Sequence, residues 1–296
     1  MMRDNRFYAE QFPLAIYGSK PIPCGDTRGY EVHILTCERD RTMAFWALKS
    51  FYYYLGERPP LVVHDDGSLA PESHRLFNDH FPGCTVVRAD RADADSRLRE
   101  SLRPLPLCEL WRFRCDFQLA KKLFDFPCFA TEPFIVGIDS DILFFRKPLE
   151  VLECANASVP FMASDYQEAY EFDAAMLQRA GQHFDLVPRL NTGLFGLRGE
   201  AFDFALVETL LEACVDASPA RRFEFWKGWL EQTMLACLFS KSAGGRVLDL
   251  SRYQISSMLI SDRTVSQHFV NDGSRSAFCH WGLRRLDEAG FLTAVS

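Results

Sequence analysis

Short apolar runs alternate with segments of helical periodicity along the first half of the chain. Residues 30–37 have strand character, and apolar side chains then recur at helical spacing over 41–55. A strand is predicted at 60–64, a helix at 71–80 and another strand at 84–88. This alternation predicts an α/β fold, in which helices sandwich a mostly parallel central sheet and ligands bind at the carboxyl ends of the strands.

The pattern is less regular in the rest of the chain. Residues 89–99 are highly charged and lack an apolar run, which predicts a solvated loop, whereas 109–126 has the periodicity of one helix. The apolar run 133–138 is typical of a central, fully buried strand. Further strands are predicted at 159–164, 192–198 and 264–270, and further helices at 200–214 and 229–239. No internal repeat is present, so one domain is expected, with an irregular C-terminal segment that wraps back over it.

Composition and charge narrow the possible classes of function. The 296 residues are 48% apolar, enough to bury a large core, and carry a formal net charge of -7. This acidic balance argues against nucleic acid as a partner. No apolar stretch approaches the roughly 18 residues of a transmembrane segment, and the first residues lack a signal-peptide pattern, so a cytoplasmic protein is expected. The 10 cysteines include no Cys-x-x-Cys pair, which favours reduced, buried thiols over a zinc site.

The strand predicted at 133–138 runs directly into Asp139-Ser140-Asp141. Because side chains alternate along a strand, both carboxylates are expected to project to the same side. Like charges this close are unfavourable unless a cation neutralises them, and carboxylate oxygens suit Mg²⁺, Mn²⁺ or Ca²⁺. Two other interpretations remain open. The residues can form an ordinary solvated turn, or Asp139 can be the nucleophile of a haloacid-dehalogenase-like phosphatase.

The segment 134–148, Phe-Ile-Val-Gly-Ile-Asp-Ser-Asp-Ile-Leu-Phe-Phe-Arg-Lys-Pro, resembles the Asp-x-Asp strand of GT-A-fold nucleotide-diphospho-sugar transferases. The resemblance is greatest to glycosyltransferase family 8, the glycogenin and galactosyltransferase-like group. Other matching segments follow in the family's order: Lys122, Asn191-Thr192-Gly193, Glu231-Gln232 and His268-Phe269. The resemblance implies a Rossmann-like GT-A fold, with a nucleotide-binding half at about 28–145 and an acceptor-side half at about 146–296 of a single domain.

The metal site implied by this resemblance holds Mn²⁺ or Mg²⁺ between Asp139, Asp141 and a histidine. The sequence departs from the family here, because His268 is followed by Arg275 at one residue more than the His-x-x-Gly-x-x-Lys spacing, with Arg in place of Lys. We expect His268 to be the ligand, since a predicted strand delivers it to a loop, and Arg275 to meet a phosphate as a bidentate donor. His280 remains the alternative ligand.

The resemblance also implies a binding site for a nucleoside diphosphate sugar, with UDP as the expected nucleotide. Lys122 matches the family's helix-borne cation at the donor phosphates, although Lys121 is an equal candidate from spacing alone. The remaining residues expected to contact the donor nucleotide are the loop residue Ser140 and the end of the first strand, Thr36, Cys37 and Glu38.

Residues around the transferred sugar are implied in the same way. Asp165 matches a position that holds a sugar hydroxyl, Asn191 can present its amide to another, and Gln232 matches the neighbour of the anomeric carbon, with Glu231 beside it. From the residues alone, Asp165 can instead cap a helix that runs from Gln167 onward, and Glu231 can be stabilised by the dipole of its own helix.

Trp226 and Trp229 precede that helix, where aromatic faces can bind the ring of an acceptor or simply pack in the core. The function predicted from all of these features is a metal-dependent glycosyltransferase of the hexosyltransferase type. It would move a sugar from a nucleoside diphosphate donor to a sugar or other hydroxyl acceptor, with retention of configuration implied by the family. The alternatives are the phosphatase and a non-catalytic sugar-nucleotide-binding protein.

Overall fold

A seven-stranded sheet forms the centre of the computed structural model, which describes residues 6–115, 117–171, 174–217, 229–256, 260–270 and 274–296. Its strands lie in the order β3-β2-β1-β4-β7-β6-β8. Strands β1, β2, β3 and β4 are parallel to one another, whereas β7 is antiparallel to both β4 and β6. The bounds are β1 Tyr30–Thr36, β2 Leu61–Asp65, β3 Thr85–Val87, β4 Phe134–Asp139, β6 Phe161–Ser164, β7 Leu190–Arg198 and β8 Arg246–Leu248. The mostly parallel sheet predicted from the alternation is therefore confirmed.

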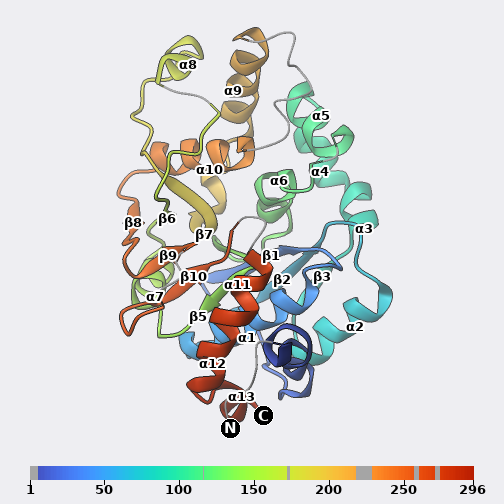
Figure 1. Ribbon diagram of the computed structural model, residues 1–296. Helices are drawn as coiled ribbons and strands as arrows, with labels where there is room; N and C mark the ends of the chain where they lie inside the picture. The colour runs from blue at the N-terminus through green and yellow to red at the C-terminus, as the bar shows by residue number, and fades with distance from the viewer. Residues whose placement is uncertain (1–5, 116, 172–173, 218–228, 257–259, 271–273) are drawn as a thin grey trace.

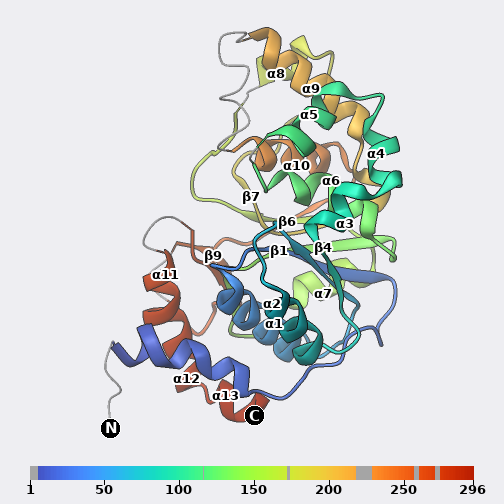
Figure 2. The same ribbon diagram turned by 90° about the vertical axis from the view of Figure 1, so that its right-hand side faces the viewer.

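Helices cover both faces of this sheet, as Figures 1 and 2 show. One face packs on α1 Arg41–Leu55, α2 Pro71–His80, α7 Leu149–Asn156, α12 Arg284–Glu288 and α13 Phe291–Val295. The other face packs on α4 Ser96–Leu102, α5 Pro106–Arg114, α6 Ala120–Phe129, α8 Ala174–Arg179, α9 Phe204–Ala217 and α10 Leu230–Lys241. The remaining helices are α3 Ala89–Ala94 and α11 Ser274–Ala277.

Strand β4 is buried on both faces because its side chains alternate between the two cores. Val136 packs in the core on the α1 side, and Ile135 packs in the core on the α6 side. Gly137 leaves room for a neighbouring ring, since a Cβ there would lie 2.2 Å from Phe195 Cε1. The apolar run 133–138 is thus a central strand, as predicted, and it delivers Asp139 to the carboxyl edge of the sheet.

A second sheet, of three strands, carries the other half of the predicted metal site. Its order is β5-β10-β9, with β5 Ile142–Phe144, β9 Tyr253–Ile255 and β10 Ser266–His268. In the antiparallel β5/β10 pair, His268 lies opposite Ile142. The backbone N–H of Phe269 also donates to the carbonyl of Asp141 at 3.0 Å. This pairing fixes the distance between the end of β10 and the end of β4.

Two sequence-based expectations in the first half are wrong. The segment 89–99 is not a solvated loop, because it forms α3 and the first turns of α4. The Asp95 carboxylate caps α4 by accepting from the N–H groups of Arg97 and Leu98, and Leu98 is buried. The single helix expected over 109–126 is two helices, because α5 ends at Arg114 and Cys115 is extended, with φ -93° and ψ 137°.

The C-terminal segment wraps back over the first half as expected, but it is a series of short helices rather than irregular chain. Helix α11 continues into the π-helix Phe278–Leu283 and then into α12 and α13. It lies against the N-terminal helical turns Phe7–Gln11 and Phe12–Gly18, where the Tyr8 hydroxyl donates to Asp287 at 2.7 Å. Among the helices described, none has both the length and the apolarity to cross a bilayer.

Candidate active site

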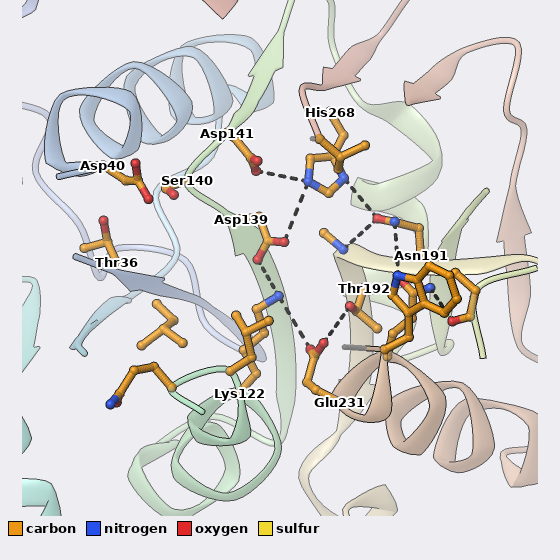
Figure 3. Close-up of a pocket in the computed structure, with 18 of the residues that line it drawn as sticks. Thr36, Asp40, Lys122, Asp139, Ser140, Asp141, Asn191, Thr192, Glu231 and His268 are labelled. Carbon is orange, nitrogen blue, oxygen red and sulfur yellow. Dashed lines mark hydrogen bonds and ion pairs between the residues drawn. The ribbon is translucent and has the colours of Figure 1, made fainter. Parts of the chain in front are cut away.

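A cavity of about 400 Å³ lies at the carboxyl ends of β1 and β4. Because β7 is antiparallel to β4, its first residues reach the same edge, and the start of α10 and the end of β10 complete the wall. Figure 3 shows how these elements direct polar side chains toward one another. The residues singled out from the sequence that line this cavity are Thr36, Cys37, Lys122, Asp139, Ser140, Asp141, Asp165, Asn191, Thr192, Gly193, Trp229, Glu231, Gln232 and His268.

Asp139, Asp141 and His268 converge in this cavity. His268 Nε2 lies 3.0 Å from Asp141 Oδ1 and 3.7 Å from Asp139 Oδ2. One ligand atom from each of the three residues lies within 4.8 Å of the others. Two carboxylates and an imidazole form a donor set suited to a borderline or hard divalent cation. Asp139 is the last residue of β4, Asp141 lies in the turn between β4 and β5, and the β5/β10 pairing brings His268 to both.

The charge of the cavity favours a bound cation. Carboxylates outnumber basic groups among the lining residues described, and Asp40 and Asp66 add to Asp139 and Asp141. Burial disfavours the charged form of Asp141, but the adjacent imidazole and ammonium groups outweigh it and lower the pKa of that carboxyl. Burial likewise opposes protonation of His268, yet Asp141 and Asp139 raise its pKa. A divalent cation can replace the proton between these groups, so the residues fit a metal ion.

Lys122 supplies a fixed positive charge beside the pair of acids. It projects from α6, is buried, and its Nζ lies 2.5 Å from Asp139 Oδ1 and 3.5 Å from Glu231 Oε1. Thr192 Oγ1 donates to Glu231 Oε2 at 3.2 Å. Burial raises the pKa of Glu231 to about 7, with Lys122 opposing the shift. These contacts hold the ammonium at the floor of the cavity.

The neighbouring Lys121 points elsewhere. Its Nζ donates to the carbonyls of Asp65 and Asp66, at 3.1 and 2.7 Å. Lys121 therefore ties α6 to the end of β2 and does not line the cavity. Of the two lysines that the sequence left open, the structure places Lys122 in the site.

Polar side chains of the opposite wall are hydrogen-bonded to one another. Asn191 Nδ2 donates to Asp165 Oδ2 at 3.1 Å and to Gln232 Oε1 at 3.3 Å. Gln232 Nε2 donates to the carbonyl of Ala169 at 3.0 Å. Asp165 also accepts from the N–H of Gln167 and lines the cavity, but it closes a turn and does not cap a helix from Gln167, because α8 begins only at Ala174. The side chains predicted around the transferred sugar are thus brought together on one wall.

The end of β1 forms the other side of the cavity. Thr36 is buried, and its Oγ1 has no hydrogen-bond partner within the described ranges of the chain. The Cys37 thiol donates to Asp40 Oδ2 at 3.2 Å, and burial raises its pKa. Glu38 turns away, because its carboxylate accepts from Ser73 Oγ at 2.6 Å and from the N–H of Ala70. Glu38 holds the start of α2 and is not among the residues lining the cavity.

Arg275 and His280 lie outside the cavity wall. The Arg275 guanidinium contacts the carboxylate of Asp40, which does line the cavity, and donates to the carbonyl of Arg39 at 2.8 Å. His280 Nδ1 lies 2.9 Å from Ser276 Oγ, on the π-helix after α11, and is not one of the three clustered ligands. Between the two histidines, the structure places His268 with the acids.

Some lining residues were not found by reasoning from the sequence. Asp40, Gln118, Leu119 and Gln167 all lie in loops at the ends of secondary-structure elements. The signal for Asp40 was its position just after the first predicted strand, where parallel sheets bind ligands. Trp229 was singled out and is half exposed at the cavity, whereas Trp226 lies outside the described residues.

The fold is that of the GT-A class, as comparison with solved structures shows. No protein-family model matches the sequence, and no curated protein sequence matches it significantly. Mouse xyloside xylosyltransferase 1 in its apo form is a similar solved structure, with a TM-score of 0.53, 13% identity and coverage of 86% of this chain and 99% of that chain.

Two further solved structures share the fold. The galactosyltransferase LgtC in complex with donor and acceptor sugar analogues has a TM-score of 0.50 and 14% identity, over 90% of this chain and 97% of that chain. The glycosyltransferase GlyE of Streptococcus pneumoniae TIGR4 has a TM-score of 0.52 and 10% identity, over 90% of this chain and 64% of that chain. These similarities establish that the chain has the GT-A fold of the glycosyltransferases, as the resemblance implied.

Proposed function

We propose that this protein is a metal-dependent glycosyltransferase that moves a sugar from a nucleoside diphosphate donor, UDP in the first instance, to a hydroxyl acceptor. The observation that carries the proposal is the convergence of Asp139, Asp141 and His268 beside Lys122, at the edge of the sheet where open α/β folds bind their ligands. The fold of the solved glycosyltransferases supports it.

Asp139, Asp141 and His268 would hold the divalent cation, either Mn²⁺ or Mg²⁺. When bound, such a cation supplies electrostatic stabilisation of the negative charge that develops on a departing diphosphate. Lys122 adds a fixed ammonium at the same place, held by Asp139 and Glu231. Because these groups are arranged before the substrate arrives, little reorganisation is needed as charge develops.

The nucleoside would bind at the end of β1. Thr36 Oγ1 is buried with its hydrogen-bonding capacity unused in the described structure, which leaves it available to a polar edge of the ligand. Cys37 and Asp40 lie beside it along the cavity. Arg275 contacts Asp40 from outside, and a donor phosphate would compete with Asp40 for its guanidinium.

The sugar would lie against the wall formed by Asp165, Asn191 and Gln232. Asp165 and Gln232 line the cavity with carboxylate and amide oxygens that can accept from sugar hydroxyls. Trp229 is 50% exposed at the same cavity, where its indole face can pack on the apolar face of an acceptor ring. Retention of anomeric configuration is part of the proposal through the resemblance to family 8, and NMR of the first product formed tests it.

A thermal-shift experiment tests the donor site directly. The melting temperature is measured with UDP, UDP-glucose, UDP-galactose, GDP or ADP, each with and without Mn²⁺, because a ligand that binds the native state raises it. A rise that requires both nucleotide and Mn²⁺ supports the proposal. The absence of any Mn²⁺-dependent rise across this panel would overturn it.

A turnover experiment separates the proposed activity from its rivals. Slow hydrolysis of the UDP-sugar without acceptor is expected of a transferase, because water can replace the acceptor hydroxyl. Metal-dependent nucleotide binding with no release of sugar would instead indicate a sugar-nucleotide-binding protein. Trapping by beryllium fluoride, together with hydrolysis of a simple phosphate ester, would indicate a phosphatase with Asp139 as nucleophile.

A further inference from the structure

Asn191 makes hydrogen bonds with every polar atom of its side chain. It is the second residue of β7, and its side chain is buried beside the cavity. Oδ1 accepts from the N–H of Gly193 at 2.9 Å and lies 3.0 Å from His268 Nδ1. Nδ2 donates to Asp165 and Gln232. The amide is therefore fully used by the protein, which leaves no donor hydrogen free for a sugar hydroxyl.

Two of these contacts set the orientation of the amide without reference to His268. The backbone N–H of Gly193 can only donate, so its partner is the amide oxygen. The Asp165 carboxylate can only accept when ionised, so its partner is the amide nitrogen. The atom of Asn191 that faces His268 is consequently an acceptor.

An acceptor at this position decides which nitrogen of His268 carries hydrogen. Because Asn191 Oδ1 has no hydrogen to give, the 3.0 Å contact requires a hydrogen on Nδ1 of His268. The Nε2 atom, which faces Asp139 and Asp141, is then the one that can present a lone pair to a cation. Partners of this kind set the orientation and basicity of metal-binding histidines.

Gly193 leaves the space that the imidazole ring of His268 occupies. A Cβ at this position would lie 2.3 Å from His268 Cε1 and 2.4 Å from Nδ1. No side chain fits there without moving the ring. At the start of β7, Gly193 thus leaves space for the imidazole ring, and Asn191, two residues earlier in the chain, orients it.

We propose that Asn191 is a positioning residue that holds His268 with Nε2 directed at the cation, and that it joins the metal site to Asp165 and Gln232 on the sugar-binding wall. The inference rests on the proposed function only in requiring that Asp139, Asp141 and His268 bind a divalent cation. This role differs from the one expected from the sequence, in which the Asn191 amide hydrogen-bonds to a sugar hydroxyl.

Mn²⁺ binding to the full-length protein tests this inference without any substrate. The dissociation constant is measured by electron paramagnetic resonance, and nitrogen coupling to the bound Mn²⁺ is measured by pulsed methods. Wild type is expected to show nitrogen coupling that His268→Ala abolishes. Asn191→Ala is expected to bind Mn²⁺ roughly 10- to 100-fold more weakly and to lose most of that coupling.

The conservative variant Asn191→Asp keeps an oxygen facing His268 Nδ1 but removes the donor to Asp165 and Gln232. It is expected to retain the nitrogen coupling that Asn191→Ala loses, a rescue that a purely structural role for Asn191 would not predict. Asn78→Ala, which changes an exposed amide on α2, is the matched control and should bind Mn²⁺ as wild type does.

The outcomes are distinguishable from failure of the proposed function. If wild type binds no Mn²⁺, the metal site itself is wrong. If wild type binds Mn²⁺ and a folded Asn191→Ala binds it equally well with the same nitrogen coupling, Asn191 does not position His268. If Asn191→Ala fails to fold, loss of nitrogen coupling in Asn191→Asp overturns the inference instead.

Discussion

Two regions of this molecule bury ionisable side chains, and they differ in where their charges are neutralised. Between α5 and α6, Arg112 binds the carboxylate of Asp125, with Nη2 donating to Oδ2 at 2.7 Å, and both side chains are almost wholly buried. At the end of β4, Asp139 and Asp141 share Lys122 and His268 while facing a cavity. The first cluster is complete within the protein, whereas the second leaves negative charge facing the space where a ligand would bind.

A second closed cluster lies on the same side of the sheet. The Glu31 carboxylate accepts from the backbone N–H of Thr131 and lies 2.9 Å from His33 Nε2. His33 Nδ1 in turn lies 2.9 Å from His64 Nε2, and both rings contact Phe126 on α6. The comparison teaches that buried charge alone does not identify a functional site in this fold. What distinguishes the β4 end is an unbalanced charge beside a cavity.

The largest expected effect comes from opening the closed Arg112–Asp125 pair. Asp125→Ala leaves the Arg112 guanidinium buried with only Asp93 as a charged partner, and the free energy of unfolding should fall by about 3–5 kcal/mol. Urea denaturation measures this loss. Mn²⁺ affinity of the folded variant should stay unchanged, because Asp125 does not line the cavity.

The exposed pair Arg88–Asp90 provides the control for this experiment. Its side chains are 59% and 68% exposed, so Asp90→Ala should change the free energy of unfolding by less than about 1 kcal/mol. Equal losses in Asp125→Ala and Asp90→Ala would show that the buried pair is not a closed, stabilising cluster.

Removing a charge from the open cluster should lower activity and Mn²⁺ affinity and leave stability nearly unchanged. Asp139→Asn is expected to lower kcat for UDP-sugar hydrolysis roughly 100- to 1,000-fold, by analogy with the loss of one preorganised electrostatic group, and to weaken Mn²⁺ binding. Stability of the metal-free protein should change by no more than about 1 kcal/mol, because relieved repulsion with Asp141 offsets the lost contact with Lys122, which keeps Glu231 as a partner. Asp262→Asn, at a side chain that is 85% exposed, is the control and should keep both kcat and Mn²⁺ affinity. If Asp139→Asn kept the wild-type kcat, Asp139 and Asp141 would not take part in the reaction as proposed.

The open cluster was the part of the site that the sequence could predict. An apolar strand followed by Asp139 and Asp141 carries its own physical signal, because it brings two carboxylates to the sheet edge where parallel strands bind ligands. The expected alternation holds only as far as Asp139, since Asp141 lies in the turn between β4 and β5. His268 could also be placed, since a short strand delivers it to a loop. Local patterns of this kind need no knowledge of distant neighbours.

Other parts could not be predicted because their partners are distant in the chain. The carboxylate of Glu38 binds Ser73 and the N–H of Ala70 on α2, which nothing near Glu38 in the sequence indicates. Glu31 and His33 lie in a strand whose pattern is apolar, and they hydrogen-bond to Thr131 and to His64 of β2, which are distant in the sequence. Helices α3 and α4 were missed because they bury few apolar side chains, among them Leu98 and Leu102.

The dependence of stability on pH tests the cluster of His33 and His64, and the expected effect is of intermediate size. Burial lowers the pKa of His33 and lowers that of His64 further, so both rings bind a proton less readily in the folded protein than in the unfolded chain, where histidine titrates at about pH 6.5. Each ring should therefore reduce stability as the pH falls through this range, by up to about 1.4 kcal/mol per pH unit, whereas Glu231, whose pKa burial raises to about 7, contributes in the opposite direction. Unfolding free energies from urea denaturation between pH 7.5 and 5 check the slope.

The His64→Phe variant sharpens that titration. Phenylalanine can occupy the place of His64 beside Phe126 but binds no proton, so the slope should lessen by about one proton. His183→Gln changes an exposed histidine and serves as the control, with the wild-type slope expected. An unchanged slope in His64→Phe would mean that this ring does not carry the pH dependence.

The smallest expected effect concerns the rim of the open cavity. Trp229→Ala removes a half-exposed indole at the cavity without touching a charged group, so donor hydrolysis should keep its kcat and KM. The KM for a pyranoside acceptor should rise roughly fivefold, the equivalent of about 1 kcal/mol of lost ring packing. Trp281→Ala is the matched control, because Trp281 is 52% exposed on the C-terminal π-helix and does not line the cavity. Because Trp229 immediately precedes α10, a rise in the donor KM of Trp229→Ala would show instead that the indole positions Glu231 and Gln232, and the acceptor would then have to bind elsewhere on the rim.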